Sequence, residues 1–120
     1  MEANKKKHID LTYLKELSNG SNAFIVEIIT GFLTETPRVI DNLEKQLNAA
    51  NWDALRATAH KMKPSFSFVG IKELGDVINS VETNSAAKTN LDLIPGMISK
   101  IKTVFEEAAQ ELEIEKKNFL

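Results

Sequence analysis

The chain has 120 residues, of which 42% are hydrophobic and 27% charged, a composition typical of one globular domain and too apolar for a disordered chain. A formal net charge of −2 argues against the positive surface that nucleic-acid binding requires, and the absence of cysteine excludes disulfides, thiolate nucleophiles and thiolate metal sites. We expect a single domain over residues 1–120. We expect its first nine residues to form a flexible polar tail, without a signal peptide or a membrane span, and the predicted compartment is cytoplasmic.

Apolar residues recur at spacings of three and four almost throughout, and no stretch alternates like a strand, so the sequence predicts an all-α fold. A short helix is expected between Asp10, as N-cap, and Gly20, where a left-handed backbone is tolerated. A long second helix follows, capped by Ser21 or Asn22 and kinked at Pro37. The inward residues expected in these two helices are Leu11, Leu14, Leu17, Ile25, Ile28, Phe32, Ile40, Leu43 and Leu47.

Three more helices are expected after the second helix ends near Asn51. The third covers residues 52–69, Gly70 separates it from the fourth, and the polar residues 83–90 are expected to form a loop before the last helix. Short connections favour an antiparallel up-down four-helix bundle with the short N-terminal helix added. Its inward residues are expected to be Trp52, Leu55, Ala59, Met62, Phe66, Val69, Leu74, Val77, Ile78, Val81, Ile94, Ile98, Ile101, Phe105, Ala108 and Leu112.

The chain contains two histidines, and no spacing around them matches a nucleophile elbow, a zinc motif or a phosphate-binding glycine loop. His8 lies in the lysine-rich tail, where we expect a solvated side chain with no role. Helical geometry turns His60 away from the core stripe of its helix, so we expect it to face solvent. The same geometry places around it Ala57, Lys61, Pro64 and an exposed Phe68, with Lys63 and Ser67 on the flank toward the core.

The segment Ala59-His60-Lys61-Met62-Lys63-Pro64-Ser65, followed by Gly70, resembles the signature of histidine-containing phosphotransfer domains: alanine, histidine, any residue, leucine, lysine, glycine, serine. Met62 in place of leucine conserves volume. Pro64 departs from the usual glycine and leaves the His60 carbonyl to be satisfied by water, at a cost of about 3 kcal/mol in an ordinary helix interior. The resemblance extends over nearly the whole chain, through Phe32-Leu33, Pro37, Trp52-Asp53, Leu74 and Val81-Glu82.

The resemblance implies a phosphocarrier rather than an enzyme. His60 would accept a phosphoryl group from the phosphoaspartate of one receiver domain and pass it to another, while the receiver's acidic residues hold the magnesium ion and this chain binds no cofactor. Lys63, one turn on, is placed to offer positive charge to the phosphoryl oxygens. The expected partners are response-regulator receiver domains and a hybrid sensor histidine kinase, bound by a monomer. The remaining implied residues are Gly70, which closes the active helix, and a docking surface of Ala57, Lys61, Pro64, Ser67 and Phe68.

The sequence leaves two alternatives to a phosphocarrier. A helical adaptor would keep the bundle and its docking surface but use no histidine phosphorylation, and Pro64 is the feature that favours it. A metal-binding bundle enzyme is disfavoured because the sequence has no Glu-x-x-His pair. The charged ends of the chain fit either a free-standing protein or a fragment of a hybrid kinase.

Overall fold

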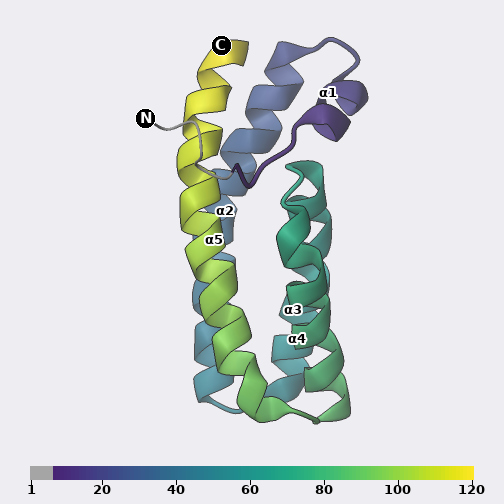
Figure 1. Cartoon of the computed structure of the whole chain (residues 1–120), viewed down its shortest axis with the longest axis vertical. Helices are drawn as coiled ribbons and strands as arrows, with labels where there is room; N and C mark the ends of the chain where they lie inside the picture. The colour runs from purple at the N-terminus through teal and green to yellow at the C-terminus, as the bar shows by residue number, and fades with distance from the viewer. Residues whose placement is uncertain (1–6) are drawn as a thin grey trace.

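The computed structural model describes residues 7–120, and within that range it consists of helices and turns without a strand. The long helices α2 and α5 run side by side, α3 and α4 form a shorter antiparallel pair, and α1 lies above the upper ends of α3 and α4 (Figure 1). The predicted all-α bundle with an additional N-terminal helix is therefore confirmed. The helices are α1 (Thr12–Ser18), α2 (Asn22–Asn48), α3 (Trp52–Phe68), α4 (Gly75–Ala87) and α5 (Ile94–Lys116), with the single 3-10 turns η1 (Lys72–Leu74), η2 (Leu91–Leu93) and η3 (Lys117–Phe119).

One core runs through the bundle and contains most of the predicted inward residues. Phe32 of α2 packs edge-on against Phe66 of α3, with ring centroids 5.1 Å apart, and against Phe105 of α5, at 5.5 Å. Each fully buried side chain of this size contributes about 1.5–3 kcal/mol relative to an exposed one. Ile29 is a core residue that the predicted stripe omitted, and four predicted residues are only partly buried against the core, namely Ile28, Leu47, Trp52 and Val77.

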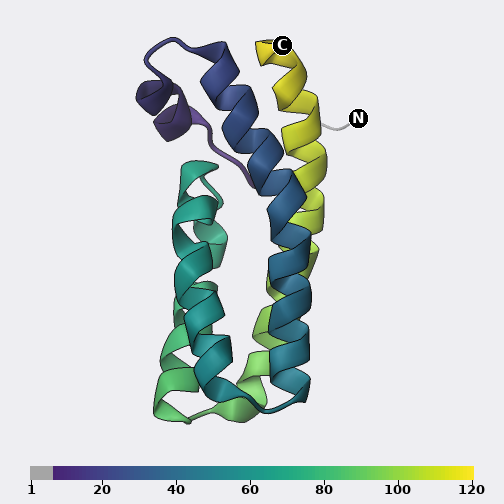
Figure 2. The same cartoon turned by 180° about the vertical axis from the view of Figure 1, so that it is seen from behind.

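The helix ends follow from local side-chain chemistry. Ser21 begins α2, because its hydroxyl accepts a hydrogen bond from the Phe24 N–H at 3.1 Å. The Asn51 side chain accepts from the Ala54 N–H at 3.3 Å and begins α3 in the same way. Pro37 lies inside α2, which continues past it as a single helix (Figure 2). The Ser21 and Asn51 caps each stabilise their helix by about 1 kcal/mol.

Two sequence-based expectations about the helices are wrong. Leu17 is 44% exposed, because α1 has only two turns and buries its Leu14 side instead. The predicted loop over residues 83–90 is helical as far as Ala87, and α4 ends in a left-handed turn at Lys88. Ser85, which is completely buried, continues the inward face of α4 one turn after Val81. A small polar residue at an inward position gave no apolar signal, so the polar stretch resembled a loop.

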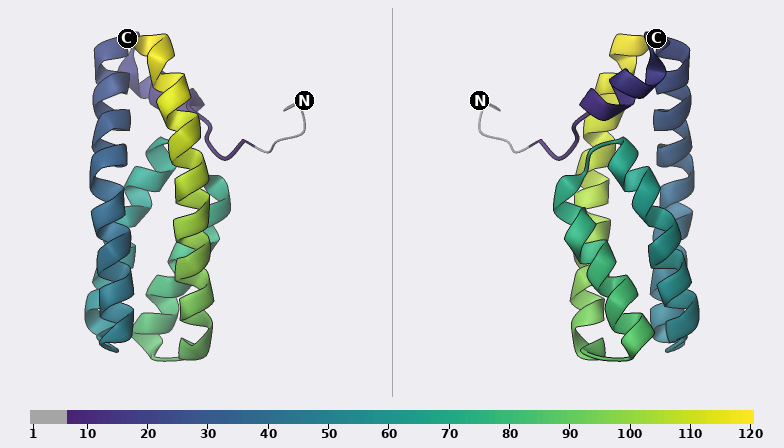
Figure 3. Two further views of the ribbon diagram at one scale, coloured as in Figure 1. Left: turned by 90° about the vertical axis from the view of Figure 1, so that its left-hand side faces the viewer. Right: turned by 90° about the vertical axis from the view of Figure 1, so that its right-hand side faces the viewer.

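The described part of the predicted flexible tail is packed against the bundle. Residues 7–10, which we call the strap, cross from α5 toward α1 (Figures 1 and 3). Ile9 belongs to the buried core, and the His8 side chain is only 10% exposed, so the expectation of a solvated His8 is wrong. Glutamates of η1 and α5 bind the ring and keep it in place. Residues 1–6 of the predicted tail lie outside the described residues.

Candidate functional site

The candidate site lies where α3 and α4 run side by side. His60 and Lys63 are one turn apart on α3, and Asn79 and Glu82 are one turn apart on α4. Residues three apart in a helix share a face, so each helix presents two polar side chains to the other. The two helices pack closely against each other, and Ala59 of α3 and Ile78 of α4 are completely buried.

Glu82 connects the two functional side chains of α3. Its Oε2 accepts a hydrogen bond from the Nδ1–H of His60 at 2.7 Å, and its Oε1 forms an ion pair with the Lys63 ammonium group. Lys63 also donates to Oδ1 of Asn79 at 3.3 Å. The hydrogen bond from Lys63, and after it the one from His60, lowers the pKa of Glu82 below its ordinary value. Glu82 therefore stays ionised at neutral pH.

The hydrogen bond to Glu82 leaves one ring nitrogen of His60 free. A carboxylate can only accept, so Nδ1 carries the proton and Nε2 of the neutral ring keeps its lone pair. Nε2 has no hydrogen-bond partner among residues 7–120. The side chain is 64% exposed, in agreement with the helical geometry, while that of Glu82 is only 19% exposed. The arrangement presents an oriented nucleophile to whatever approaches α3.

Two grooves flank this site. Arg56 lines one of about 530 Å³ between α3 and α4, together with Lys63, Asn79 and Glu82. The other, of about 670 Å³, separates α2 from α3 and has Ile28, Phe32 and Val39 on one wall. Its opposite wall includes Lys61, Met62, Ser65 and Phe68.

The predicted docking residues are not all free. Lys61, Pro64 and Ser67 are exposed and Ala57 is half-buried. Phe68 was expected to be exposed but is half-buried, because Tyr13 of α1 stacks on it with ring centroids 6.0 Å apart and planes 15° apart. Tyr13 and Phe68 therefore form one aromatic pair on the surface of α1 and α3, in which Tyr13 is the more exposed ring.

Gly70 ends α3 and also allows the strap to approach. Its N–H donates to the Ser67 carbonyl at 3.1 Å, and the Ile71 N–H donates to the Phe66 carbonyl at 3.1 Å, which together form the hydrogen-bond pattern of a Schellman motif. This motif requires the left-handed backbone observed here, with φ of +71°. A Cβ at this position would also overlap the backbone carbonyl of Asp10. Only glycine satisfies both requirements.

Sequence reasoning missed Glu82 and Asn79 as members of the site. Val81-Glu82 was noticed as part of the family resemblance but was given no role. The missing signal is the spacing of three between Asn79 and Glu82, which places both on one side of the predicted fourth helix. Which helix that side faces depends on tertiary packing and is not apparent from the spacing.

The described chain has neither a metal-ligand cluster nor a membrane-spanning helix. Residues 7–120 contain no group of three or more histidine or acidic side chains that could hold a metal ion. Over the same range, no helix is both long and apolar enough to cross a bilayer.

Comparisons with known proteins agree with this geometry. The Hpt domain family matches residues 27–113, which is most of the chain and includes all four residues of the site. The crystal structure of histidine-containing phosphotransfer protein B (HptB) from Pseudomonas aeruginosa PAO1 has a similar fold, with a TM-score of 0.83 and 22% sequence identity over 92% of this chain and 96% of that one. No curated protein matches the chain. The chain therefore belongs to the histidine-containing phosphotransfer (Hpt) domain family, whose members are phosphocarriers that interact with receiver domains and histidine kinases in phosphorelays.

Proposed function

We propose that this chain accepts a phosphoryl group on Nε2 of His60 from the phosphoaspartate of one receiver domain and passes it to the aspartate of another. The observation that carries the proposal is the single hydrogen bond of the His60 ring, which binds Nδ1 to Glu82 and leaves Nε2 free and exposed. A hybrid sensor histidine kinase would supply the first receiver. The magnesium ion would be held by the receiver's acidic residues, so this chain contributes no metal site.

In the transfer step, the lone pair of Nε2 forms a bond to phosphorus as the bond from phosphorus to the aspartyl oxygen breaks, and the aspartate leaves as a carboxylate. The proton on Nδ1 stays in place, so the phosphorylated ring gains positive charge. Glu82 already accepts from that nitrogen and would stabilise the charge. In the reverse direction the electron pair of the nitrogen–phosphorus bond returns to Nε2. Such transfers depend mainly on alignment and charge stabilisation.

Lys63 would stabilise charge on the phosphoryl oxygens. Its ammonium group lies one helical turn from His60, and Glu82 and Asn79 hold it beside the ring. Its side chain is partly exposed, which allows it to turn toward an arriving phosphoryl group. An ammonium group donates well to phosphoryl oxygens.

The receiver would dock over α3 and the groove between α2 and α3, using Ala57, Lys61, Pro64, Ser67 and the Tyr13–Phe68 pair. An apolar groove next to an exposed reactive group offers a partner buried area close to the chemistry. Pro64 is exposed and lies within a continuous α3, so it leaves the docking side of the helix in place.

The test is transfer of labelled phosphate from several phosphorylated receiver domains, with magnesium, to the wild type and to His60→Gln. We expect acid-labile, base-stable label on the wild type and none on the variant. A folded wild type that no receiver labels, and that phosphoramidate as a small donor also fails to label, would contradict the proposal and favour the adaptor. His60→Gln exchanges an exposed side chain, so its circular dichroism spectrum should match the wild type.

A further inference from the structure

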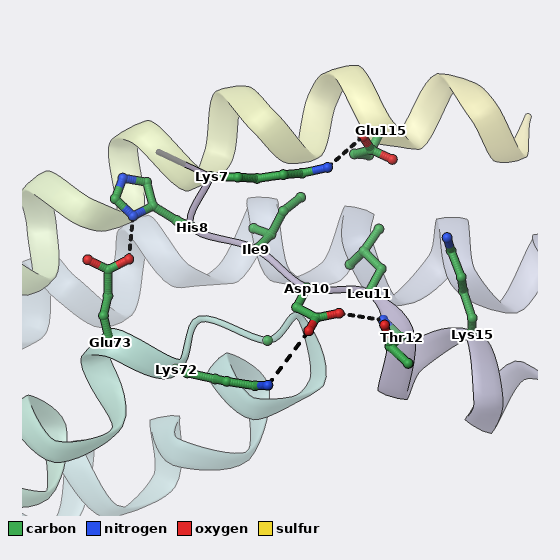
Figure 4. A pocket seen from close by; sticks show the side chains of 11 residues that line it. Lys7, His8, Ile9, Asp10, Leu11, Thr12, Lys15, Lys72, Glu73 and Glu115 are labelled. Atoms are coloured by element: carbon green, nitrogen blue, oxygen red, sulfur yellow. Dashed lines mark hydrogen bonds and ion pairs between the residues drawn. The ribbon is translucent and has the colours of Figure 1, made fainter. Parts of the chain in front are cut away.

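The strap (residues 7–10) is held by a charged cluster that the proposed reaction does not use. Both ring nitrogens of His8 are bound: Nδ1 to Glu73 of η1, and Nε2 to Oε1 of Glu107 on α5 at 2.7 Å. Figure 4 shows the ring between the strap and Glu73, below α5. A neutral imidazole can donate from only one nitrogen, whereas two carboxylates both require a donor. This geometry is complete only when His8 is protonated.

The strap backbone is attached to α5 and to the end of α3. The N–H groups of His8 and Ile9 both donate to Oε1 of Glu111, at 2.8 and 3.2 Å, which attaches the strap to α5. The Asp10 N–H donates to the Val69 carbonyl at 3.1 Å, which attaches it to the end of α3. Among the side chains of residues 7–10, only that of His8 binds both η1 and α5.

Among residues 7–120, the charged groups that face His8 are mostly negative. Glu73 faces it from η1, and Glu107 and Glu111 face it from α5. Two cations of the described chain beside it are paired with other carboxylates, Lys7 with Glu115 and Lys72 with Asp10 (Figure 4). The hydrogen bond to Glu73, opposed by desolvation and supported by Glu107, raises the pKa of His8 above its ordinary value.

The strap leads directly into α1, which forms part of the surface around the candidate site. Tyr13 of α1 stacks on Phe68 of α3. Beside this pair lies a cavity of about 460 Å³, with Tyr13 and Glu16 on its α1 wall and Lys63 on its α3 wall. Leu11 and Leu14 bury one side of α1 in the core and α1 packs on α2, so the strap is a further tie, which joins the start of α1 to the end of α3.

We propose that the strap is a protonation-dependent clamp: with His8 protonated it holds the Tyr13 side of α1 against the end of α3 and completes the surface on which a receiver docks, and with His8 neutral it loosens that contact while Leu11 and Leu14 keep α1 in the core. His8 acts here as a positioning residue, and the proposal rests on the proposed function above. A histidine whose folded pKa is raised contributes stability below its ordinary value of about 6.5 and loses that contribution as the pH rises through the folded value. The clamp is therefore closed below the ordinary histidine pKa and opens as the pH rises through the higher folded pKa of His8.

The test compares the wild type, His8→Gln and Glu106→Gln at about pH 6 and pH 8.5, on either side of the ordinary histidine pKa. Glutamine carries no charge and has both of its N–H donors on one nitrogen, so it cannot reproduce the two bonds of the protonated ring. Glu106 is exposed on α5 and has no contact with His8. Transfer from a phosphorylated receiver is measured as KM and as the rate at saturation, together with the nuclear Overhauser contact between the Tyr13 and Phe68 rings.

For the wild type and Glu106→Gln, we expect the Tyr13–Phe68 contact at pH 6 and its weakening at pH 8.5, with KM rising about fivefold or more. For His8→Gln the contact should be weak and KM high at both pH values, while the rate at saturation stays within about twofold of the wild type at the same pH. A His8→Gln protein that keeps the contact and the low KM at pH 6 would overturn the clamp.

Failure of the proposed function would give a different result. In that case neither phosphoramidate nor the receivers would label any variant. The pH dependence of the Tyr13–Phe68 contact would then be the test of the clamp. If phosphoramidate labels wild type and His8→Gln equally while only the variant's KM for the receiver changes, His8 acts on docking and not on the chemistry.

Discussion

The two histidines of this chain both bind a glutamate from a neighbouring element, but they differ in how much of the ring remains free. At His60 one nitrogen binds Glu82 and the other is open, in a side chain that is 64% exposed. At His8 both nitrogens bind carboxylates, in a side chain that is 10% exposed. The first arrangement orients a nucleophile, and the second makes a structural cation.

This comparison shows that a histidine–glutamate pair is not sufficient to identify a reactive site. A carboxylate on one nitrogen selects a tautomer and leaves the ring neutral and reactive on the other side. A second carboxylate favours the protonated ring, which has no lone pair to donate. The number of acceptors around the ring, and its exposure, separate the two roles.

The largest effect should come from exchanging each histidine for glutamine and labelling with phosphoramidate. His60→Gln should lose all base-stable label, because no other free imidazole nitrogen lies in the described chain. His8→Gln should incorporate label like the wild type. Label that follows His8 instead of His60 would reverse the comparison.

The second effect tests the backbone that brings the strap to α3. Gly70→Ala should lower the free energy of unfolding by about 2 kcal/mol or more, because alanine is disfavoured at φ of +71° and its Cβ would displace the Asp10 carbonyl. Gly31→Ala, inside α2 and with open space around it, is the control and should raise that free energy by about 0.5–1 kcal/mol. Urea unfolding measures both, and equal changes of the same sign would contradict the account.

The third effect concerns Glu82. Glu82→Gln keeps an acceptor for His60 but removes the charge that would stabilise the phosphorylated ring, so transfer from a receiver should slow about tenfold, equivalent to about 1.4 kcal/mol. Asp76→Asn, an exposed change on the same helix, should leave the rate unchanged.

Glu82 also predicts a pH dependence of stability. Its lowered pKa means that its contribution is present above the ordinary carboxylate value of about 4.3 and is lost as the pH falls through the lower folded value. Thermal unfolding of the wild type and of Glu82→Gln should therefore differ at neutral pH and converge in acid below that value. A constant difference down to the lowest pH would show that charge is not the cause.

The smallest effect should come from Lys7, another charged tie of the strap. Its ion pair with Glu115, at 3.1 Å, lies at the surface, so Lys7→Ala should change the free energy of unfolding by less than about 0.5 kcal/mol. His8→Gln should cost more at about pH 6 than Lys7→Ala does, because His8 is enclosed and bound twice. Urea unfolding that ranks the two variants in the opposite order would assign the strap's stability to Lys7.

The fold was predictable because each helix buries a stripe at helical spacing, from Ile25 in α2 to Leu112 in α5. The exposure of His60 was predictable from its angle to such a stripe. Its hydrogen bond to Glu82 was not predictable, because that bond depends on which side of α4 meets α3. The packing of His8 was missed for a related reason: a polar segment attached by glutamates 65 to 103 residues away leaves no periodic signal.

The most direct test of the account is to find which nitrogen carries the phosphoryl group. After transfer from a phosphorylated receiver to ¹⁵N-labelled protein, long-range proton–nitrogen correlations of the imidazole rings identify the modified atom. The account predicts phosphate on Nε2 of His60, with Nδ1 protonated and bonded to Glu82. Phosphate on Nδ1 of His60, or on either nitrogen of His8, would contradict it.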